Sequence, residues 1–416
     1  MMRRLGVSAL VVVLAVGAAA CSSDDDSADD SATGSVTPTS SVAAASGACK
    51  PETVANGADG ATVAAVVERV ATANDLTTVL YRVMRGGEVV ASGARGDNYA
   101  GSPADASLHF RVGNVAFGYM GTLLLRFVEE GKATLDDPIS TWVPDSGLPG
   151  ADEVTLRMLV QNTSGYADYV RTDAFVDKFL ADPFAAWTPQ ELIDIGMATP
   201  PSYPPGTAWS YAHTNYVILG EALEKIGGHD LGALLTDHIF RPLGLADTAP
   251  ALTPDVPAPV LRSYSTERRV FEETTNWNPS WQTAPGSVVT STICDMATSA
   301  TRIMSGALLD QASSREAFTA PAATLQPPPA SCTACIEFPA GTWYGLGVIT
   351  SNGWVFQGPS FAGTSGIAAY LPADDLTVAL LAVAGKQTTA GASVASTIWT
   401  ELATELTPDH IPTPPG

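Results

Sequence analysis

Residues 110–144 read FRVGNVAFGYMGTLLLRFVEEGKATLDDPISTWVP, and the middle of this stretch is strongly apolar. The apolar run from Val115 to Glu130 is long enough for about four turns of helix. Gly131, directly after it, is a residue type that commonly ends a helix. Asn114, directly before it, is among the residue types that best cap the start of one. The stretch therefore predicts one long apolar helix that begins after Asn114 and ends at Gly131.

Segments rich in β-branched and aromatic residues lie near both ends of the chain, far from this helix in sequence. Gly86-Gly87 separates two of them and Asn352-Gly353 separates two more, and such pairs are typical of tight hairpins. One antiparallel sheet assembled from both termini, with the terminal helices on one face, accounts for this pattern. The expected strands are 77–85, 88–93, 344–350, 354–356, 365–371 and 376–384, and the expected terminal helices are 63–72 and 393–405.

The middle of the chain has a different character. Residues 150–310 alternate helical patches with loops rich in proline and glycine, such as residues 203–206 (YPPG). The expected fold class is therefore α/β, with an antiparallel sheet built from both termini and flanked by helices, and with a mostly helical inserted subdomain. The α/β parts span about 60–113 and 340–405, and the helical part spans about 114–310.

The first residues have the layout of a targeting segment. Arg3 and Arg4 precede an apolar run, and small residues stand directly before Cys21. This predicts a secretory signal peptide over residues 1–20, too short for a comfortable transmembrane span. Small residues before a cysteine resemble a bacterial lipobox, which makes Cys21 the lipidated first residue of the mature protein. Ordinary cleavage that leaves Cys21 unmodified is the alternative. Residues 21–47 are mostly Ser, Asp, Ala and Thr and predict a disordered acidic tether.

These features predict an extracytoplasmic protein, lipid-anchored to the outer face of the cell membrane in a bacterial envelope. The formal net charge of −22 argues against nucleic acid as a partner. Outside the cytoplasm, the four cysteines after Cys21 allow two disulfides in three connectivities. Cys332 and Cys335 resemble half a zinc site or a redox motif, but no second pair lies nearby, so a structural loop disulfide and no metal site are expected. The other two are Cys49 and Cys294.

Several segments together resemble one known family. Residues 110–144 are similar to the nucleophile segment of class C β-lactamases, D-alanyl-D-alanine carboxypeptidases and related esterases, in which a Phe-Arg-x-Gly run leads into Ser-x-x-Lys. Residues 159–165 (LVQNTSG), 205–220 (PGTAWSYAHTNYVILG), 285–296 (PGSVVTSTICDM), 344–347 (YGLG) and 354–366 resemble later segments of that family, in the same order. The resemblance runs from about residue 60 to 405. It implies a β-lactamase or penicillin-binding-protein-like domain over residues 48–416 that needs no cofactor.

The resemblance also implies that the two central catalytic positions are changed. Asn114 stands at the position of the family's serine, and Phe117 stands at the position of its lysine, three residues later. Acyl transfer in this family needs the serine as nucleophile and the lysine as its base, and neither an amide nor a phenyl ring can replace them. None of the five lysines of the chain has a serine three residues before it. Asn114 is still able to cap the helix, and Phe117 to fill the space of the missing lysine.

The remaining catalytic positions are partly kept. Tyr211 stands where the family has the tyrosine that relays a proton, and His213 stands where it often has asparagine. Gln357 stands at the position of the His or Lys in the last element of the family. The backbone N–H groups of Asn114 and Ser360 correspond to the family's oxyanion donors.

Three interpretations of function remain open. The first is a catalytically inactive pseudoenzyme, a lipoprotein held to the membrane at Cys21 that binds a cell-wall peptide or a protein partner. The second is an active esterase or peptidase with a relocated mechanism that uses His213 and Tyr211. Ser164 and Ser365 are poor replacement nucleophiles because the family uses their segments structurally. The third is a purely structural lipoprotein with a filled cleft. Loss of both the serine and the lysine favours the first.

Overall fold

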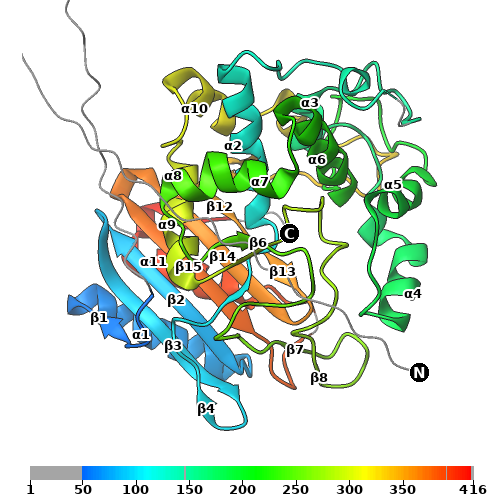
Figure 1. The fold of residues 1–416 in the computed structure, drawn as a ribbon. Helices are drawn as coiled ribbons and strands as arrows, with labels where there is room; N and C mark the ends of the chain where they lie inside the picture. The colour runs from blue at the N-terminus through cyan, green and yellow to red at the C-terminus, as the bar shows by residue number, and fades with distance from the viewer. Residues whose placement is uncertain (1–48, 145–146, 390, 414–416) are drawn as a thin grey trace, which may run out of the picture. The chain divides into compact units, whose positions relative to one another are not determined.

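The computed structural model describes residues 49–144, 147–389 and 391–413, and Figure 1 shows their arrangement. Strands from the two ends of the chain lie side by side in one antiparallel sheet, as the sequence predicts. The junction is between β2 (Thr78–Arg85) and β15 (Leu376–Val383), where Tyr81 lies opposite Leu380. The order across the sheet is β1 (Val54–Ala55), β3 (Glu88–Tyr99), β2, β15, β14 (Thr364–Leu371), β12 (Trp354–Gln357), β11 (Ile349–Ser351) and β10 (Thr342–Tyr344), with β4 (Ser102–Pro103) on β3 and β13 (Ser360–Phe361) on β14.

Helices cover both faces of this sheet. Side chains alternate between the faces of a strand, so Tyr81 and Leu380 pack with α1 (Gly57–Ala73) and α11 (Val394–Leu406), whereas Leu80 and Leu381 belong to the core on the other side. The two terminal helices thus share one face, which confirms that prediction. On the opposite face lies α9 (Ile293–Met304), which packs against β14, β15 and β2. Residues 293–304 therefore belong with the sheet, although the sequence places them in the helical insertion.

The remaining helices form the inserted part around α2 (Val115–Glu129), the helix predicted from the opening stretch. It ends where expected, because Gly131 has a positive φ of 67° and donates its N–H to the carbonyl of Val128 at 3.0 Å. The other helices are α3 (Leu156–Val160), α4 (Asp173–Ala181), α5 (Pro189–Met197), α6 (His213–Gly227), α7 (Leu231–Leu235), α8 (Arg241–Leu243) and α10 (Gln311–Phe318). Two small sheets complete the fold, one of β5 (Phe110–Arg111), β9 (Val289–Ser291) and β6 (Ala249–Pro250), the other of β7 (Tyr264–Ser265) and β8 (Glu272–Glu273).

One predicted strand, 344–350, is wrong as a single element. It is broken into β10 and β11 by a turn at residues 345–348, which packs against α2. The approach is so close that a Cβ added at Gly347 would lie 2.3 Å from the carbonyl oxygen of Phe117. A Cβ added at Gly121 would lie 2.2 Å from the carbonyl oxygen of Leu346. The turn therefore holds the start of α2 against the sheet, and glycine is required on both sides of the contact.

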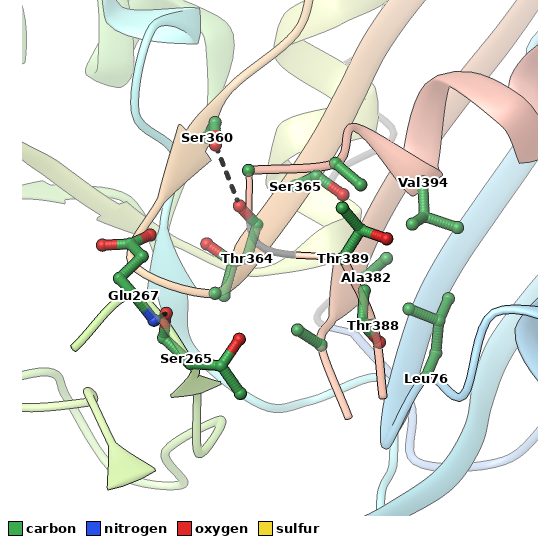
Figure 2. A pocket seen from close by; sticks show the side chains of 15 residues that line it. Leu76, Ser265, Glu267, Ser360, Thr364, Ser365, Ala382, Thr388, Thr389 and Val394 are labelled. Carbon is green, nitrogen blue, oxygen red and sulfur yellow. Dashed lines mark hydrogen bonds between the residues drawn. The ribbon is translucent and has the colours of Figure 1, made fainter. Parts of the chain in front are cut away.

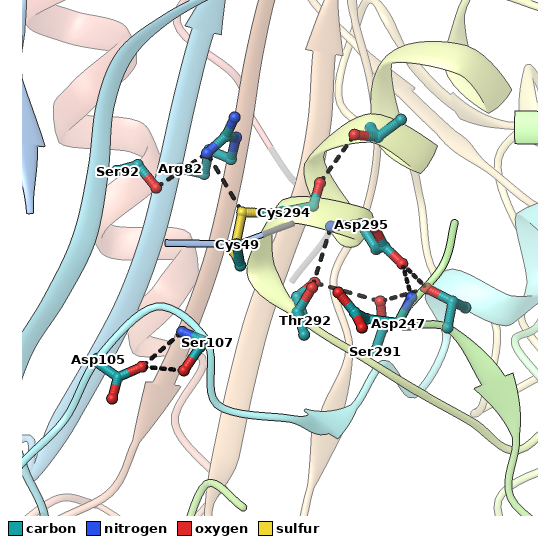
Figure 3. The surroundings of a disulfide bond; sticks show 12 residues. Cys49, Arg82, Ser92, Asp105, Ser107, Asp247, Ser291, Thr292, Cys294 and Asp295 are labelled. Carbon is teal, nitrogen blue, oxygen red and sulfur yellow. Dashed lines mark hydrogen bonds between the residues drawn. A yellow bond between two sulfur atoms is a disulfide. The ribbon is translucent and has the colours of Figure 1, made fainter. Parts of the chain in front are cut away.

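The four cysteines of residues 49–413 form two disulfides. Cys49 pairs with Cys294, which joins the residues before β1 to α9, and Figure 3 shows this bond. The Arg82 guanidinium donates to the sulfur of Cys294 at 3.4 Å and to the Ser92 hydroxyl at 3.3 Å. The second disulfide joins Cys332 to Cys335 within one loop. The sequence predicts this loop disulfide and leaves the pairing of the other two cysteines open.

The predicted signal peptide, Cys21 and the tether lie outside the described residues. Within the described part, none of the helices has the length and apolar character that crossing a membrane requires.

Candidate functional site

The start of α2 carries the two changed catalytic positions, and Asn114 does not cap the helix as predicted. Its backbone is already helical, with φ −66° and ψ −7°, and its side chain accepts no hydrogen bond from the first turn. A capping side chain needs an extended backbone at that residue to reach back to the helix N–H groups. The preceding Gly113, with φ 50°, makes the turn into the helix instead. The predicted cap is therefore wrong, although the predicted start of the helix is confirmed.

The ring of Phe117 is packed into the interior of the protein at the start of α2. The residue is only 1% exposed. Its ring stacks on Tyr216 with the ring centroids 3.6 Å apart and the planes 4° from parallel. Tyr216 is itself fixed, since its hydroxyl donates to the carbonyl of Val160 at 2.8 Å and lies 2.9 Å from the Tyr344 hydroxyl. The ring is therefore packed into the core at the start of α2, and its occupation of the lysine's space stays a prediction.

Tyr211 lies beside Phe117 with its ring centroid 6.1 Å from that of Phe117. Its hydroxyl is buried and makes no hydrogen bond of good geometry among the described residues, but the Asn114 side chain is close enough to lower the pKa of the phenol in part. Burial raises the pKa of the Tyr211 phenol well above its ordinary value, and the neighbouring Tyr344 raises it further. The phenol therefore stays protonated at neutral pH. It can donate a proton in a hydrogen bond, but it cannot serve as a phenolate base.

Gln357 holds the end of β12 against the turn that packs on α2. It is 2% exposed, and its amide donates to the carbonyl of Gly347 at 2.6 Å and to the Tyr344 hydroxyl at 3.4 Å. Burial raises the pKa of that phenol to about 12, so Tyr344 is also neutral. The side chain at the family's His or Lys position is thus tied into the packing of the site.

His213 is paired with a carboxylate that the sequence analysis missed. Its Nδ1 lies 3.1 Å from Oδ1 of Asp168, and its backbone N–H donates to the same oxygen at 3.1 Å. Asp168 caps the short helix η2 (Tyr169–Arg171), which fixes the carboxylate. The pair has the arrangement that holds a histidine base in one orientation. Asp168 and His213 are 45 residues apart and share no local motif, so no sequence signal connects them.

The neighbours of the His213 ring are aromatic. The rings of Tyr211, Tyr169, Phe117 and Trp281 have their centroids 5.0, 5.9, 6.1 and 6.4 Å from that of the imidazole. Phenyl and indole rings carry no nucleophilic oxygen, and burial raises the pKa values of the Tyr211 and Tyr169 phenols well above their ordinary value, which makes them hard to ionise. The pair is therefore an oriented base without an evident partner for acyl transfer.

Ser360 lies on the strand that corresponds to the edge of the family's site. The carbonyl of Pro359 accepts the N–H of Gly366 at 2.8 Å, and Ser360 lies opposite Ser365. Hydrogen-bonded and non-hydrogen-bonded positions alternate in an antiparallel pair, so the N–H of Ser360 points away from β14. A Cβ added at Gly113 would lie 3.7 Å from that nitrogen. The two segments predicted to carry oxyanion donors are therefore adjacent.

The serine hydroxyls near the site are engaged in structural hydrogen bonds. Ser360 is exposed, and its hydroxyl donates to the carbonyl of Thr364 at 3.3 Å (Figure 2). Ser164 is buried and donates to the Asn215 side chain at 2.6 Å. Ser365 is buried as well, and its hydroxyl accepts the N–H of Ala395 at 3.2 Å. Neither Ser164 nor Ser365 contacts His213 through these bonds, which agrees with the expectation that they are structural.

The described residues bring Asn114, Phe117, Tyr211, His213, Gln357 and Ser360 to one region around the start of α2. Within the same residues, no group of three or more His, Cys, Asp or Glu side chains could hold a metal ion. The assembled chemistry is a neutral phenol, an oriented imidazole and the backbone N–H of Ser360, which points away from β14. These groups can offer hydrogen bonds to a ligand, and the serine and lysine of the family's motif are replaced by Asn114 and Phe117.

Comparison with known proteins places these observations in a family. The family model described as Beta-lactamase matches residues 63–397. Penicillin-binding protein 4 of Amycolatopsis lactamdurans is 32% identical over 139 residues, which are 33% of this chain and 34% of that protein. Esterase EstB of Burkholderia gladioli is 28% identical over 179 residues, 40% of this chain and 45% of that protein. The chain thus spans less than half the length of these curated relatives.

Solved structures match over a larger share of the chain. A D-stereospecific amidohydrolase from Streptomyces sp. has a TM-score of 0.71 at 25% identity, with 84% of this chain and 98% of that chain covered. A D-amino acid amidase from Ochrobactrum anthropi SV3 complexed with L-phenylalanine amide has a TM-score of 0.68 at 20% identity, with 83% and 97% covered. The predicted β-lactamase and transpeptidase-like architecture is confirmed by this likeness.

Proposed function

The chain belongs to the beta-lactamase family, and we propose that it is a member without acyl transfer, anchored to the cell surface at Cys21, that binds a cell-wall peptide or a protein partner. The observation that carries the proposal is the buried ring of Phe117, 1% exposed and stacked at 3.6 Å on Tyr216. A lysine base cannot act from a position that a packed phenyl ring occupies. Asn114 removes the nucleophile as well, and in a serine protease loss of the nucleophile alone lowers kcat on the order of 10⁶-fold.

The start of the sequence and the relatives of the chain both support the proposed place at the cell surface. An apolar run, small residues and Cys21 open the sequence, followed by an acidic segment that suits a tether. The relatives include penicillin-binding proteins, which is consistent with a place in the cell envelope. The segments that carry the backbone N–H groups of Asn114 and Ser360 are adjacent, and such groups suit a carbonyl or carboxylate of a bound ligand.

One observation favours the second candidate function, hydrolysis by a relocated mechanism. The 3.1 Å contact between His213 and Asp168 resembles the base and orienting acid of many hydrolases. The aromatic neighbours of His213 leave it without a nucleophile among them, so we rank this reading second. The third reading, a purely structural lipoprotein, agrees with the filled position at Phe117 and differs from the first in predicting no ligand.

Turnover separates these readings. Residues 22–416, purified with both disulfides formed, are incubated with p-nitrophenyl acetate and with a chromogenic cephalosporin, and product absorbance is followed. The proposal predicts no rate above that of buffer for the natural sequence and for His213→Ala. Turnover that disappears in His213→Ala would establish the relocated mechanism and refute the proposal. Absence of turnover together with absence of any saturable ligand would favour the structural reading.

A further inference from the structure

An apolar hollow of about 540 Å³ adjoins the site on the side of η2 and α4. Its size lies within the range of small-molecule pockets in proteins. It is next to His213, because the Trp281 ring that lines it stacks on Phe361 and also lies 6.4 Å from the imidazole. The apolar lining residues are Val170, Phe175, Val176, Phe179, Leu180, Trp281, Phe361 and Ala362.

The walls of this hollow are aromatic and held in place by one another. Phe175 and Phe179 stack at 5.7 Å and 9° along α4, and both contact Trp281, at 5.4 and 5.2 Å. Val176, on the same helix, is 36% exposed, so the hollow is open to solvent there. Such walls favour an aryl or branched alkyl group, and aromatic faces also attract a cation.

Glu267 is the single charged residue that lines the hollow among the described residues. Burial raises the pKa of its carboxyl, and a hydrogen bond with Ser265 partly opposes this. No ion pair to Glu267 is found in the described part of the chain, whereas the nearby Arg268 lies 3.6 Å from Glu272 and Arg171 lies 4.0 Å from Asp168. Glu267 is half-buried, and a partly desolvated carboxylate without a cationic partner gains more from a cationic ligand than a fully exposed one does.

Ser360 lines the hollow together with Glu267. Ser360 and Glu267 line both this hollow and the small pocket drawn in Figure 2, so the two side chains stand between the two spaces. The Ser360 hydroxyl donates a hydrogen bond to the carbonyl of Thr364, which leaves the hydroxyl oxygen able to accept another hydrogen bond. The polar end of the hollow therefore offers two acceptors, a carboxylate and a hydroxyl oxygen. That set matches an ammonium group and disfavours a carboxylate.

We propose that this hollow binds an organic ammonium compound that carries an aryl or branched alkyl group. The apolar group lies among Phe175, Phe179 and Trp281, and the ammonium donates to Glu267. The inference deepens the proposed function, on which it rests, by naming the chemical class that the non-acylating cleft retains. It also predicts that anions such as penicillins are poor ligands of the hollow, because their carboxylate would meet Glu267.

Three probes of similar size test the charge preference. Residues 22–416 are titrated with 2-phenylethylamine, 2-phenylethanol and 3-phenylpropionate at pH 7, and binding is followed by calorimetry and by ligand-observed NMR. The amine is expected to bind with a dissociation constant at least about tenfold below that of the alcohol, as a charge-assisted contact implies, and the carboxylate is expected to bind most weakly.

Two variants locate the binding, and a third serves as the control. Glu267→Gln is expected to remove the advantage of the amine over the alcohol, and Val176→Trp is expected to weaken both by filling the hollow. Glu88→Gln removes an exposed carboxylate at the β2–β3 hairpin and is expected to change nothing. Thermal melts establish that each variant is folded.

Equal affinity for the three probes, no saturable binding of any of them, or an unchanged preference in Glu267→Gln would overturn the inference. The proposed function fails on a different result, turnover of an ester or a cephalosporin. The two failures are therefore distinguishable.

Discussion

Replacement of Phe117 by alanine measures how firmly the former catalytic position is filled. The ring is 1% exposed and stacks on Tyr216 at 3.6 Å, and Tyr216 is held by two hydrogen bonds. The surroundings therefore cannot readily collapse into the vacated space. Removal of a buried phenyl ring typically lowers the free energy of unfolding by about 3–5 kcal/mol, and we expect the upper part of this range.

Phe117→Lys is expected to be at least as damaging as Phe117→Ala. The ammonium would enter a space enclosed by Tyr211, Tyr216 and the His213 ring, without a carboxylate among these neighbours. An unpaired buried charge costs several kcal/mol or displaces its surroundings. Restoring the family's lysine therefore does not restore a working site.

Urea unfolding at pH 7, followed by tryptophan fluorescence with the disulfides intact, gives the free energies. Phe184→Ala is the matched control, because Phe184 is 60% exposed and its loss is expected to cost less than about 0.5 kcal/mol. A cost below about 1 kcal/mol for Phe117→Ala would refute the reasoning, since it would mean that the ring is not packed and that the position is open.

Three further predictions concern the tether, the helix caps and pH. Cys21→Ser is expected to move the protein from the membrane fraction to the soluble fraction on cell fractionation, because the lipid anchor is lost. An unchanged distribution would contradict lipidation. Asn114→Ala is expected to change the unfolding free energy by less than about 0.5 kcal/mol because its side chain caps nothing, whereas Thr188→Ala, which breaks a capping box, is expected to cost about 1 kcal/mol. Hydrogen bonds from the Thr188 backbone, Lys178 and the Thr188 hydroxyl lower the pKa of Glu191 from 4.5 to about 2. A lowered pKa in the folded state stabilises the protein above about pH 4.5, and the benefit disappears as the pH falls through about 2. The difference in Tm between the natural sequence and Glu191→Gln is therefore expected to shrink between pH 6 and pH 2.5, and a difference that stays constant would contradict the assignment.

Local patterns were sufficient to predict the main elements of the fold. The apolar run before Gly131 predicts α2, and the Gly86-Gly87 turn predicts the β2–β3 hairpin, because both depend on neighbours in sequence. The break between β10 and β11 was not predictable in this way. It arises where Gly347 packs against Phe117 of α2, more than 200 residues earlier in the chain, and where Gly345 packs against Ala317 of α10.

In the candidate site, too, some features depend on neighbours in sequence and others depend on tertiary packing. The changed residues Asn114 and Phe117 follow from the spacing within a recognisable motif. The geometry around them does not, since Asn114 adopts a helical backbone that prevents capping and Asp168 reaches His213 from a separate element. The charge of the hollow depends on Glu267, which packs near α4 only through the tertiary fold. Contacts of this kind leave no periodic signal in the sequence.

Covalent capture tests the loss of acyl transfer most directly. Residues 22–416 are incubated with benzylpenicillin and with an activated acyl ester, and the intact mass is recorded beside an untreated sample. The proposed function predicts an unchanged mass with both reagents, because no nucleophile stands at Asn114 and no base at Phe117. An added acyl mass, mapped to one residue by peptide analysis, would contradict it and would identify the nucleophile that the chain uses.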